Sequence, residues 1–172
     1  IKIFIAKRYM KLNRWKLYHK RAYSFSEKYE MNDKELSRFR NRHTGYIPQG
    51  NSAVFSLNVK ENILLPTMYS GEEGKVDDKE LEEMMDRLSI SELAGVMPNE
   101  LSGGELRRAL IARALINRPE IIIADEPVSD LDVNSADEVM RIFAGLNNEG
   151  VTLLVVSHDL DTLKYGNKVY TM

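Results

Sequence analysis

Two continuous runs of apolar residues limit what this chain can fold into more than any other feature. The first run is Ile121 to Ala124, and the second is Val151 to Val156, interrupted only by Thr152. Strands that are apolar on both faces belong in parallel sheets covered by helices. The segment between the runs has apolar residues at helical spacing and ends at Gly150. The pattern therefore predicts a strand–helix–strand unit of an α/β fold.

Other segments carry the periodicity of amphipathic helices. Apolar residues recur at i, i+3, i+4 and i+7 from Leu81 to Leu88, and they recur similarly in the segment 106–114. Between the apolar runs, Ser135 and Glu138 have the spacing of a capping box, which predicts a helix start near Ser135. Residues 45–50 predict a short strand that enters a loop, and the polar segment 70–78 predicts another loop.

Length and composition set broader limits. The chain of 172 residues fits one domain, and its 43% of apolar residues allows a core. It has no cysteine, which excludes disulfides and thiolate metal sites. Residues 1–44 hold 13 Lys/Arg against 4 Asp/Glu, whereas residues 45–172 hold 11 against 22. A basic segment can bind nucleic acid or anionic lipid, but a solvated face is the commoner explanation, and we expect no nucleic acid partner.

Polar residues follow both apolar runs. Asp125-Glu126-Pro127 follows the first and Ser157-His158-Asp159 follows the second. The carboxyl ends of parallel strands meet at one edge of a sheet, where ligands bind. There Asp125 could hold Mg²⁺ for phosphoryl chemistry, and Glu126 could orient or deprotonate the attacking water. Acids also follow buried strands merely as loop residues or helix caps, so this motif by itself is weak.

The segment Leu101-Ser102-Gly103-Gly104-Glu105 precedes a predicted helix. Its glycines let backbone N–H groups approach an anion closely, and the helix points its positive end towards them. The Ser102 hydroxyl adds a donor. Serine and glycine are also ordinary residues at a capped helix start, which is the simpler explanation of the same letters.

Five motifs, in order and with fitting spacing, resemble those of the nucleotide-binding domain of ABC transporters. Residues 101–105 resemble the signature motif and residues 125–127 the Walker B motif. Residues 129–132 are similar to the D-loop, although the family usually has a small residue at the position of Asp130. Gln49 matches the Q-loop glutamine and His158 the switch histidine. The resemblance covers residues 32–172, and residues 32–46 are most similar to exporters of the lipoprotein-release and macrolide/peptide-efflux group.

The resemblance implies a P-loop NTPase-like fold, with a mainly parallel sheet, flanking helices and an α-helical subdomain over residues 50–100. Residues 1–44 would form a disturbed, basic start of the core, and residues 101–172 would carry the signature helix and the Walker B and switch core. It implies ATP and Mg²⁺ as cofactors, a second nucleotide-binding domain paired head to tail, a transmembrane permease subunit, and a place at the cytoplasmic face of the cell membrane. The implied sites are Glu126 and His158 for catalysis, Gln49, Ser102, Gly103, Gly104, Glu105 and Asp132 for the nucleotide, and Asp125 and Gln49 for the metal.

The 172 residues contain no P-loop sequence G-x-x-x-x-G-K-[ST], whose backbone N–H groups and lysine hold phosphates. Ile1-Lys2-Ile3 resembles the helix that follows a P-loop, so we expect the N-terminal part of the core to be truncated and the chain by itself not to bind ATP. Three functions stay open: an ATPase subunit powering export, a non-catalytic partner that lends its signature motif to an intact ATPase, and a non-functional fragment. DNA-repair ATPases with the same motifs insert a long coiled coil, and no sustained heptads occur here.

Overall fold

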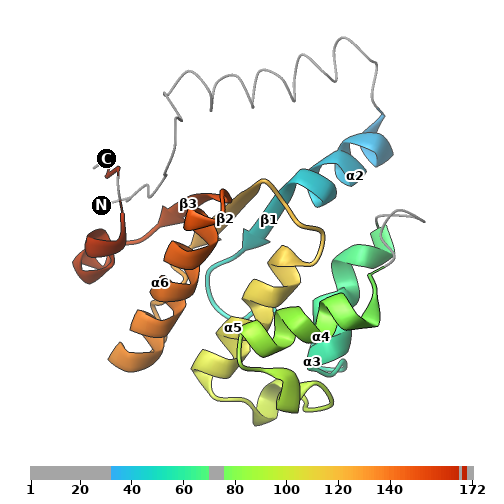
Figure 1. Ribbon diagram of the computed structural model, residues 1–172, viewed down its shortest axis with the longest axis horizontal. Helices are drawn as coiled ribbons and strands as arrows, with labels where there is room; N and C mark the ends of the chain where they lie inside the picture. The colour runs from blue at the N-terminus through green and yellow to red at the C-terminus, as the bar shows by residue number, and fades with distance from the viewer. Residues whose placement is uncertain (1–31, 70–75, 167, 170–172) are drawn as a thin grey trace.

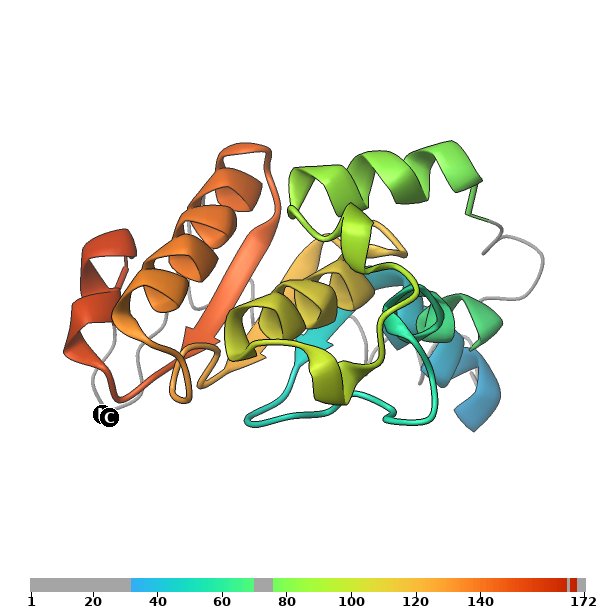
Figure 2. The ribbon, with the colours of Figure 1, turned by 90° about the horizontal axis from the view of Figure 1, so that it is seen from below.

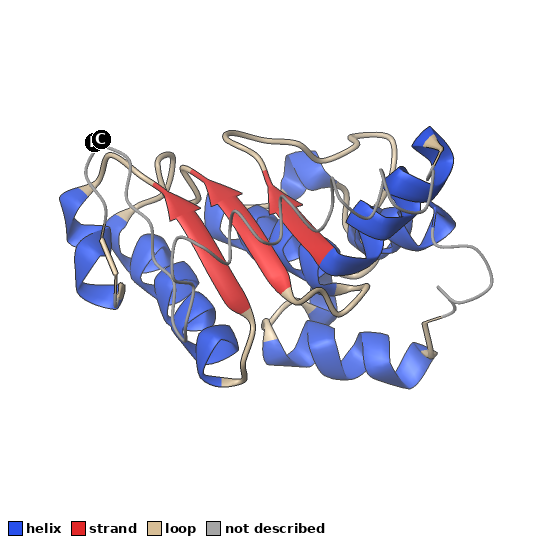
Figure 3. Ribbon diagram, turned by 90° about the horizontal axis from the view of Figure 1, so that it is seen from above, coloured by secondary structure: helices blue, strands red, loops and turns tan. Residues whose placement is uncertain are grey.

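The computed structural model describes residues 32–69, 76–166 and 168–169 of the protein. Within these ranges it contains a three-stranded parallel sheet with the order β1-β2-β3, drawn as three aligned arrows in Figure 3. The strands are β1 (Thr44–Ile47), β2 (Ile121–Asp125) and β3 (Thr152–Val156). The predicted α/β class, the parallel sheet and the strand–helix–strand unit are confirmed. The predictions about the basic residues 1–31 lie outside the described residues.

Helices precede, separate and follow the three strands along the chain. Helix α2 runs directly into β1, and α6 connects β2 to β3 (Figure 1). The bounds are α2 (Asp33–His43), α3 (Val59–Leu64), α4 (Asp78–Arg87), α5 (Gly103–Leu115) and α6 (Val133–Asn148), with short 3₁₀ helices η1 (Leu65–Tyr69), η3 (Ser91–Leu93), η4 (Pro98–Glu100) and η5 (Leu160–Tyr165).

The predicted start of α6 was wrong, because the N-cap lies three residues before Ser135. The N-cap is Asp132, whose carboxylate accepts the N–H groups of Asn134 (3.0 Å) and Ser135 (3.1 Å). Asp132 and Ser135 are both good capping residues, but Ser135 lies within the first turn of α6, where its own N–H is one of the free donors that Asp132 accepts. Glu138 makes no capping box; it binds Arg108 of α5 instead, at 3.1 Å. Similarly, the loop predicted to 78 ends earlier, because Asp77 caps α4.

Helices α5 and α6 pack against one face of the sheet, as Figures 2 and 3 show from opposite sides. Alternate residues of β2 and β3 point into this layer and are buried, whereas their neighbours along these two strands are half-buried; in β1, Tyr46 is exposed. The predicted helical stripes supply most of the remaining core. The whole core includes Ile47, Ile122, Ala124, Leu153 and Val155 from the sheet, Leu81, Met85 and Leu88 around α4, Ala109, Leu110 and Ala114 from α5, and Val139, Met140, Phe143 and Leu146 from α6.

Candidate active site at the carboxyl edge of the sheet

The register places the predicted site residues of three strands at one edge. Ile47 pairs with Ala124, and Ala124 pairs with Val155. The residues that follow these pairs therefore leave the sheet side by side. Gln49 and Glu126 lie two residues beyond this level and His158 lies three residues beyond it, so all three follow the strands at the same edge of the sheet.

Glu126 leaves β2 in an unusual backbone conformation. Its φ is +48°, a left-handed value that costs a residue with a Cβ about 1–2 kcal/mol. Its N–H still donates to the carbonyl of Val156 at 2.7 Å, which extends the β2–β3 ladder by one bond. The chain then turns, and Ser129 returns to Glu126 through bonds from its N–H and its hydroxyl to the Glu126 carbonyl. The turn thus fixes the Glu126 side chain against the end of β3.

Glu126 and His158 meet at this edge, as the parallel sheet predicted. His158 Nδ1 lies 2.8 Å from Glu126 Oε1. The glutamate side chain is only 12% exposed, whereas the histidine is 70% exposed. The second carboxylate oxygen, Oε2, is buried and has no hydrogen-bond partner. A buried acceptor without a partner is costly, and such atoms mark places where a water molecule or another donor binds. The pair therefore offers one oxygen for orientation by His158 and one for a water proton.

The loop that carries His158 is held from both sides. Ser157 is fully buried, and its hydroxyl accepts the N–H of Asp159 at 3.0 Å. Further along, η5 is anchored to α6 because Asp137 accepts bonds from the Tyr165 hydroxyl and from Lys164. The hydrogen bond from Tyr165 is the main reason that the pKa of Asp137 lies below its ordinary value. No local sequence pattern indicates this anchor, since Lys164 and Tyr165 lie 27 and 28 residues from Asp137 in the chain.

Gln49 is exposed in the loop after β1. The same loop is fastened to α5 by Arg113, whose guanidinium donates to the Ser52 carbonyl at 2.9 Å and to the Ser52 hydroxyl at 2.6 Å. Burial lowers the pKa of Arg113. Sequence reasoning missed this residue, because its partner Ser52 lies 61 residues away in the chain.

The signature segment forms a capped helix start. The Ser102 hydroxyl donates to Glu105 Oε2 at 2.7 Å and accepts the Glu105 N–H at 3.4 Å, while the Ser102 N–H donates to Glu105 Oε2 at 2.8 Å. These bonds from Ser102 hold the pKa of Glu105 below its ordinary value. Gly103 is exposed, but Gly104 is buried against Ser135 of α6. Of the predicted nucleotide-contact residues here, Ser102 and Gly103 face outward, Glu105 completes the cap, and Gly104 packs against α6.

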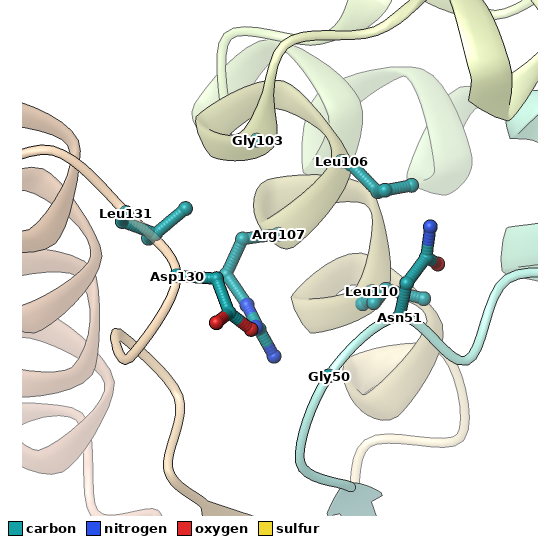
Figure 4. A pocket seen from close by; sticks show the side chains of 8 residues that line it. All are labelled: Gly50, Asn51, Gly103, Leu106, Arg107, Leu110, Asp130 and Leu131. Carbon is teal, nitrogen blue, oxygen red and sulfur yellow. The ribbon is translucent and has the colours of Figure 1, made fainter.

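A pocket lies where the signature helix, the loop after Gln49 and the D-loop meet (Figure 4). Asp130 lines it from the D-loop, whereas Asp132, predicted as a nucleotide contact, uses its carboxylate to cap α6. Sequence reasoning did not single out Arg107, which also lines this pocket. Its lining residues are Gly50, Asn51, Gly103, Leu106, Arg107, Leu110, Asp130 and Leu131.

The predicted metal residues fit Mg²⁺ only as part of a larger set. Among the described residues, no cluster of three or more His, Asp, Glu or Cys side chains could hold a metal ion. Mg²⁺ commonly keeps several waters and takes one or two carboxylates plus substrate phosphates. Asp125, half-buried at the end of β2, and Gln49, exposed in the loop after β1, suit such a water-rich arrangement, since each can supply a side-chain oxygen. Separately, none of the helices in the described ranges is both long and apolar enough to cross a membrane.

Comparison with known proteins agrees with this arrangement. Residues 18–129 match the family model described as ABC transporter. The chain is 38% identical over 137 residues to the uncharacterized ABC transporter ATP-binding protein YknY of Bacillus subtilis (strain 168), covering 80% of this chain and 60% of that protein. It is 40% identical over 130 residues to the lipoprotein-releasing system ATP-binding protein LolD of Bacteroides fragilis (strain YCH46), covering 75% and 60%. The chain thus spans about three-fifths of the length of these relatives.

Solved structures give the same result. The dimeric structure of MJ0796, a bacterial ABC transporter cassette, superposes with a TM-score of 0.69 at 33% identity, covering 80% of this chain and 61% of that one. A dimeric post-hydrolysis state of the same cassette, bound to ADP and Pi, superposes with a TM-score of 0.67 over 79% and 61%. The described fold therefore corresponds to about three-fifths of a complete cassette of that kind.

Proposed function

The chain belongs to the ABC transporter family of ATP-binding domains, and from this premise we propose that it couples ATP hydrolysis to export across a membrane. The observation that carries the proposal is the Glu126–His158 pair with its free, buried Oε2. Relatives named as lipoprotein-releasing and macrolide-export ATP-binding proteins support export as the direction of transport.

The edge residues have separate tasks in the proposed reaction. Mg²⁺, when bound, neutralises charge on the ATP phosphates. Asp125 would help to hold the metal ion, and Glu126 Oε2 orients and deprotonates the attacking water. His158 contacts the γ-phosphate from its exposed position, and its bond to Oε1 keeps the Glu126 carboxylate in place. Gln49, in the exposed loop after β1, joins this site to the surface that meets the permease.

The outward-facing start of α5 supports a composite site. Ser102 and Gly103 are exposed at the positive end of a 13-residue helix, which favours anionic ligands. In the proposed head-to-tail dimer, this helix start completes the ATP site of a second nucleotide-binding domain. The cassettes to which the chain is similar are dimers, and a permease partner would hold the pair at the cytoplasmic face of the membrane.

The 172 residues by themselves would not bind ATP usefully. They include no P-loop sequence, and each charge-assisted hydrogen bond to a phosphate contributes about 1.5–3 kcal/mol. Binding at millimolar ATP corresponds to only ~4 kcal/mol, so the loss of several such bonds removes it. A longer gene product that contains a P-loop would act as an ATPase. Without one, the exposed Ser102 and Gly103 favour the second candidate, a non-catalytic domain that lends its signature helix to an intact partner.

The test compares Glu126→Gln with the control Glu92→Gln in the full gene product. Glu92 is exposed on η3, outside the proposed site. We expect Glu126→Gln to lower ATP turnover by at least about 10²-fold, the usual contribution of a general base, while ATP binding and the control stay unchanged. Unchanged turnover in Glu126→Gln would refute the catalytic role. If the full product binds no ATP, the chain is mixed with an intact cassette whose own signature motif has been mutated. Restored ATP turnover by that cassette, lost again when the chain carries Ser102→Ala, identifies the lending role.

A further inference from the structure

Arg107 is a buried, positively charged residue of the signature helix α5. Only 5% of the residue is exposed, and its Nη1 is buried without a hydrogen-bond partner. Arginine stays protonated in proteins, so its charge cannot be removed by losing a proton. A buried charge is costly unless another charge or a set of hydrogen bonds compensates it. The position of Arg107 therefore requires a compensating group nearby.

Asp130 of the D-loop supplies the opposite charge. Both side chains line the pocket between α5 and the D-loop, and Figure 4 shows the Asp130 carboxylate beside the Arg107 guanidinium. These two described residues form no ion pair within 4.0 Å, so the attraction acts across the pocket that both line. Burial lowers the pKa of Arg107, and the charge of Asp130 offsets part of that effect.

The backbone of the D-loop is also close to the start of α5. A Cβ on Gly103 would lie 3.2 Å from Leu131 Cδ2 and 3.8 Å from the carbonyl oxygen of Asp130. The D-loop therefore meets the signature helix in two ways: the Leu131 side chain and the Asp130 carbonyl lie close to Gly103, and the Asp130 carboxylate attracts Arg107. Asp130 itself is exposed, so the attraction to Arg107 holds the solvent-exposed D-loop close to α5.

We propose that Arg107 is a positioning residue that holds the D-loop against the signature helix by electrostatic attraction to Asp130. The significance of this tether rests on the proposed function, because both tethered segments belong to the ATP site of a dimer. The tether makes the signature helix and the segment 129–132 move as one unit. A shift of Ser102 against a nucleotide would then be transmitted to the turn that follows Glu126.

The experiment needs no nucleotide, so it can fail or succeed independently of the ATPase test. Hydrogen exchange of the amides of residues 128–132 is measured in the full chain, together with urea unfolding. The variants are Arg107→Met, Arg107→Lys, Asp130→Asn and the double variant Arg107→Met/Asp130→Asn. Arg87→Met is the control, since Arg87 forms an exposed ion pair with Glu149 elsewhere on the surface.

We expect Arg107→Met to accelerate exchange at 128–132 about tenfold without lowering the urea midpoint, because an apolar side chain of similar length suits the buried position. Arg107→Lys should restore slow exchange, and the control should change nothing there. Asp130→Asn should shift the unfolding equilibrium about tenfold towards the unfolded state when Arg107 is present, but not in the Arg107→Met background. Additive effects, or unchanged exchange in Arg107→Met, would overturn the tether. If Arg107→Met does not fold, the exchange of Asp130→Asn decides: unchanged rates at 128–132 also overturn it.

Discussion

Replacing Gly104 by alanine tests whether this signature glycine serves packing. Gly104 is the second residue of α5 and is buried where α5 crosses the start of α6. A Cβ added there would lie 2.9 Å from Ser135 Oγ and 3.1 Å from Ser135 Cβ. Ser135 cannot move away easily, because its hydroxyl donates to Asp132 Oδ2 at 2.5 Å and its N–H is part of the α6 cap. The added methyl group must therefore separate the two helix starts.

The magnitude follows from two opposing effects. Overpacking a well-packed contact costs about 1–3 kcal/mol. Alanine favours the helix over glycine by up to ~1 kcal/mol, and by less in the first turn. The net loss for Gly104→Ala is therefore about 1–2 kcal/mol, which lowers the Tm of a domain of this size by roughly 2–8 °C.

Gly145→Ala is a matched control because it makes the same chemical change within a helix. Gly145 lies inside α6, and a Cβ there would have no atom within 4 Å. We expect this variant to gain about 0.5–1 kcal/mol, so the two alanine variants should shift Tm and urea midpoint in opposite directions. Circular dichroism during heating and urea titration measures both. Equal stability of the two variants would show that α5 and α6 do not approach as closely as described, and Gly104→Ala/Ser135→Gly should recover stability if they do.

Two further predictions concern the cap of α6 and the loop after Gln49. Hydrogen bonds, first that from the Ser135 hydroxyl, lower the pKa of Asp132, so its contribution to stability is present above the ordinary carboxyl pKa of about 4 and is lost as the pH falls through the lowered value. Asp132→Ala should therefore lower the urea midpoint at pH 7, with the difference from wild type shrinking below about pH 4, and a constant difference would contradict the assignment. Arg113→Met removes both bonds to Ser52, so amide exchange over residues 50–54 should accelerate about tenfold, as for ~1.4 kcal/mol of local stability, whereas Arg87→Met should leave it unchanged.

The strands and the buried stripes could be predicted because they follow from local patterns. The apolar run at 121–124 became β2, and the alternation of buried and half-buried residues in β2 and β3 follows from strand geometry. The meeting of Glu126 with His158 needed only the parallel pairing of these strands. These predictions used only the spacing of apolar residues and the pairing of parallel strands, and neither depends on a particular side-chain contact between distant residues.

The failures occurred where a residue has a partner far away in the chain. Glu138 has capping-box spacing from Ser135, but its carboxylate binds Arg108, 30 residues earlier. Arg107 and Arg113 interrupt an apolar stripe, and local periodicity assigns charged residues to the solvent. The structure instead buries Arg107 beside the D-loop and uses Arg113 to fasten the loop at Ser52. Local spacing cannot distinguish a solvated cation from one with a distant partner.

The strained backbone of Glu126 has no explanation in local structure alone. Three residues other than glycine have positive φ among the described residues: Ser89, Arg118 and Glu126. Ser89 and Arg118 follow the ends of α4 and α5, where a left-handed residue commonly ends a helix. Glu126 follows a strand, where no such rule applies. Its conformation persists because the Val156 carbonyl and the Ser129 hydroxyl hold the backbone while His158 holds the carboxylate. Strain that several separate contacts maintain, at a carboxylate with one buried free oxygen, supports the general-base role that we propose for Glu126.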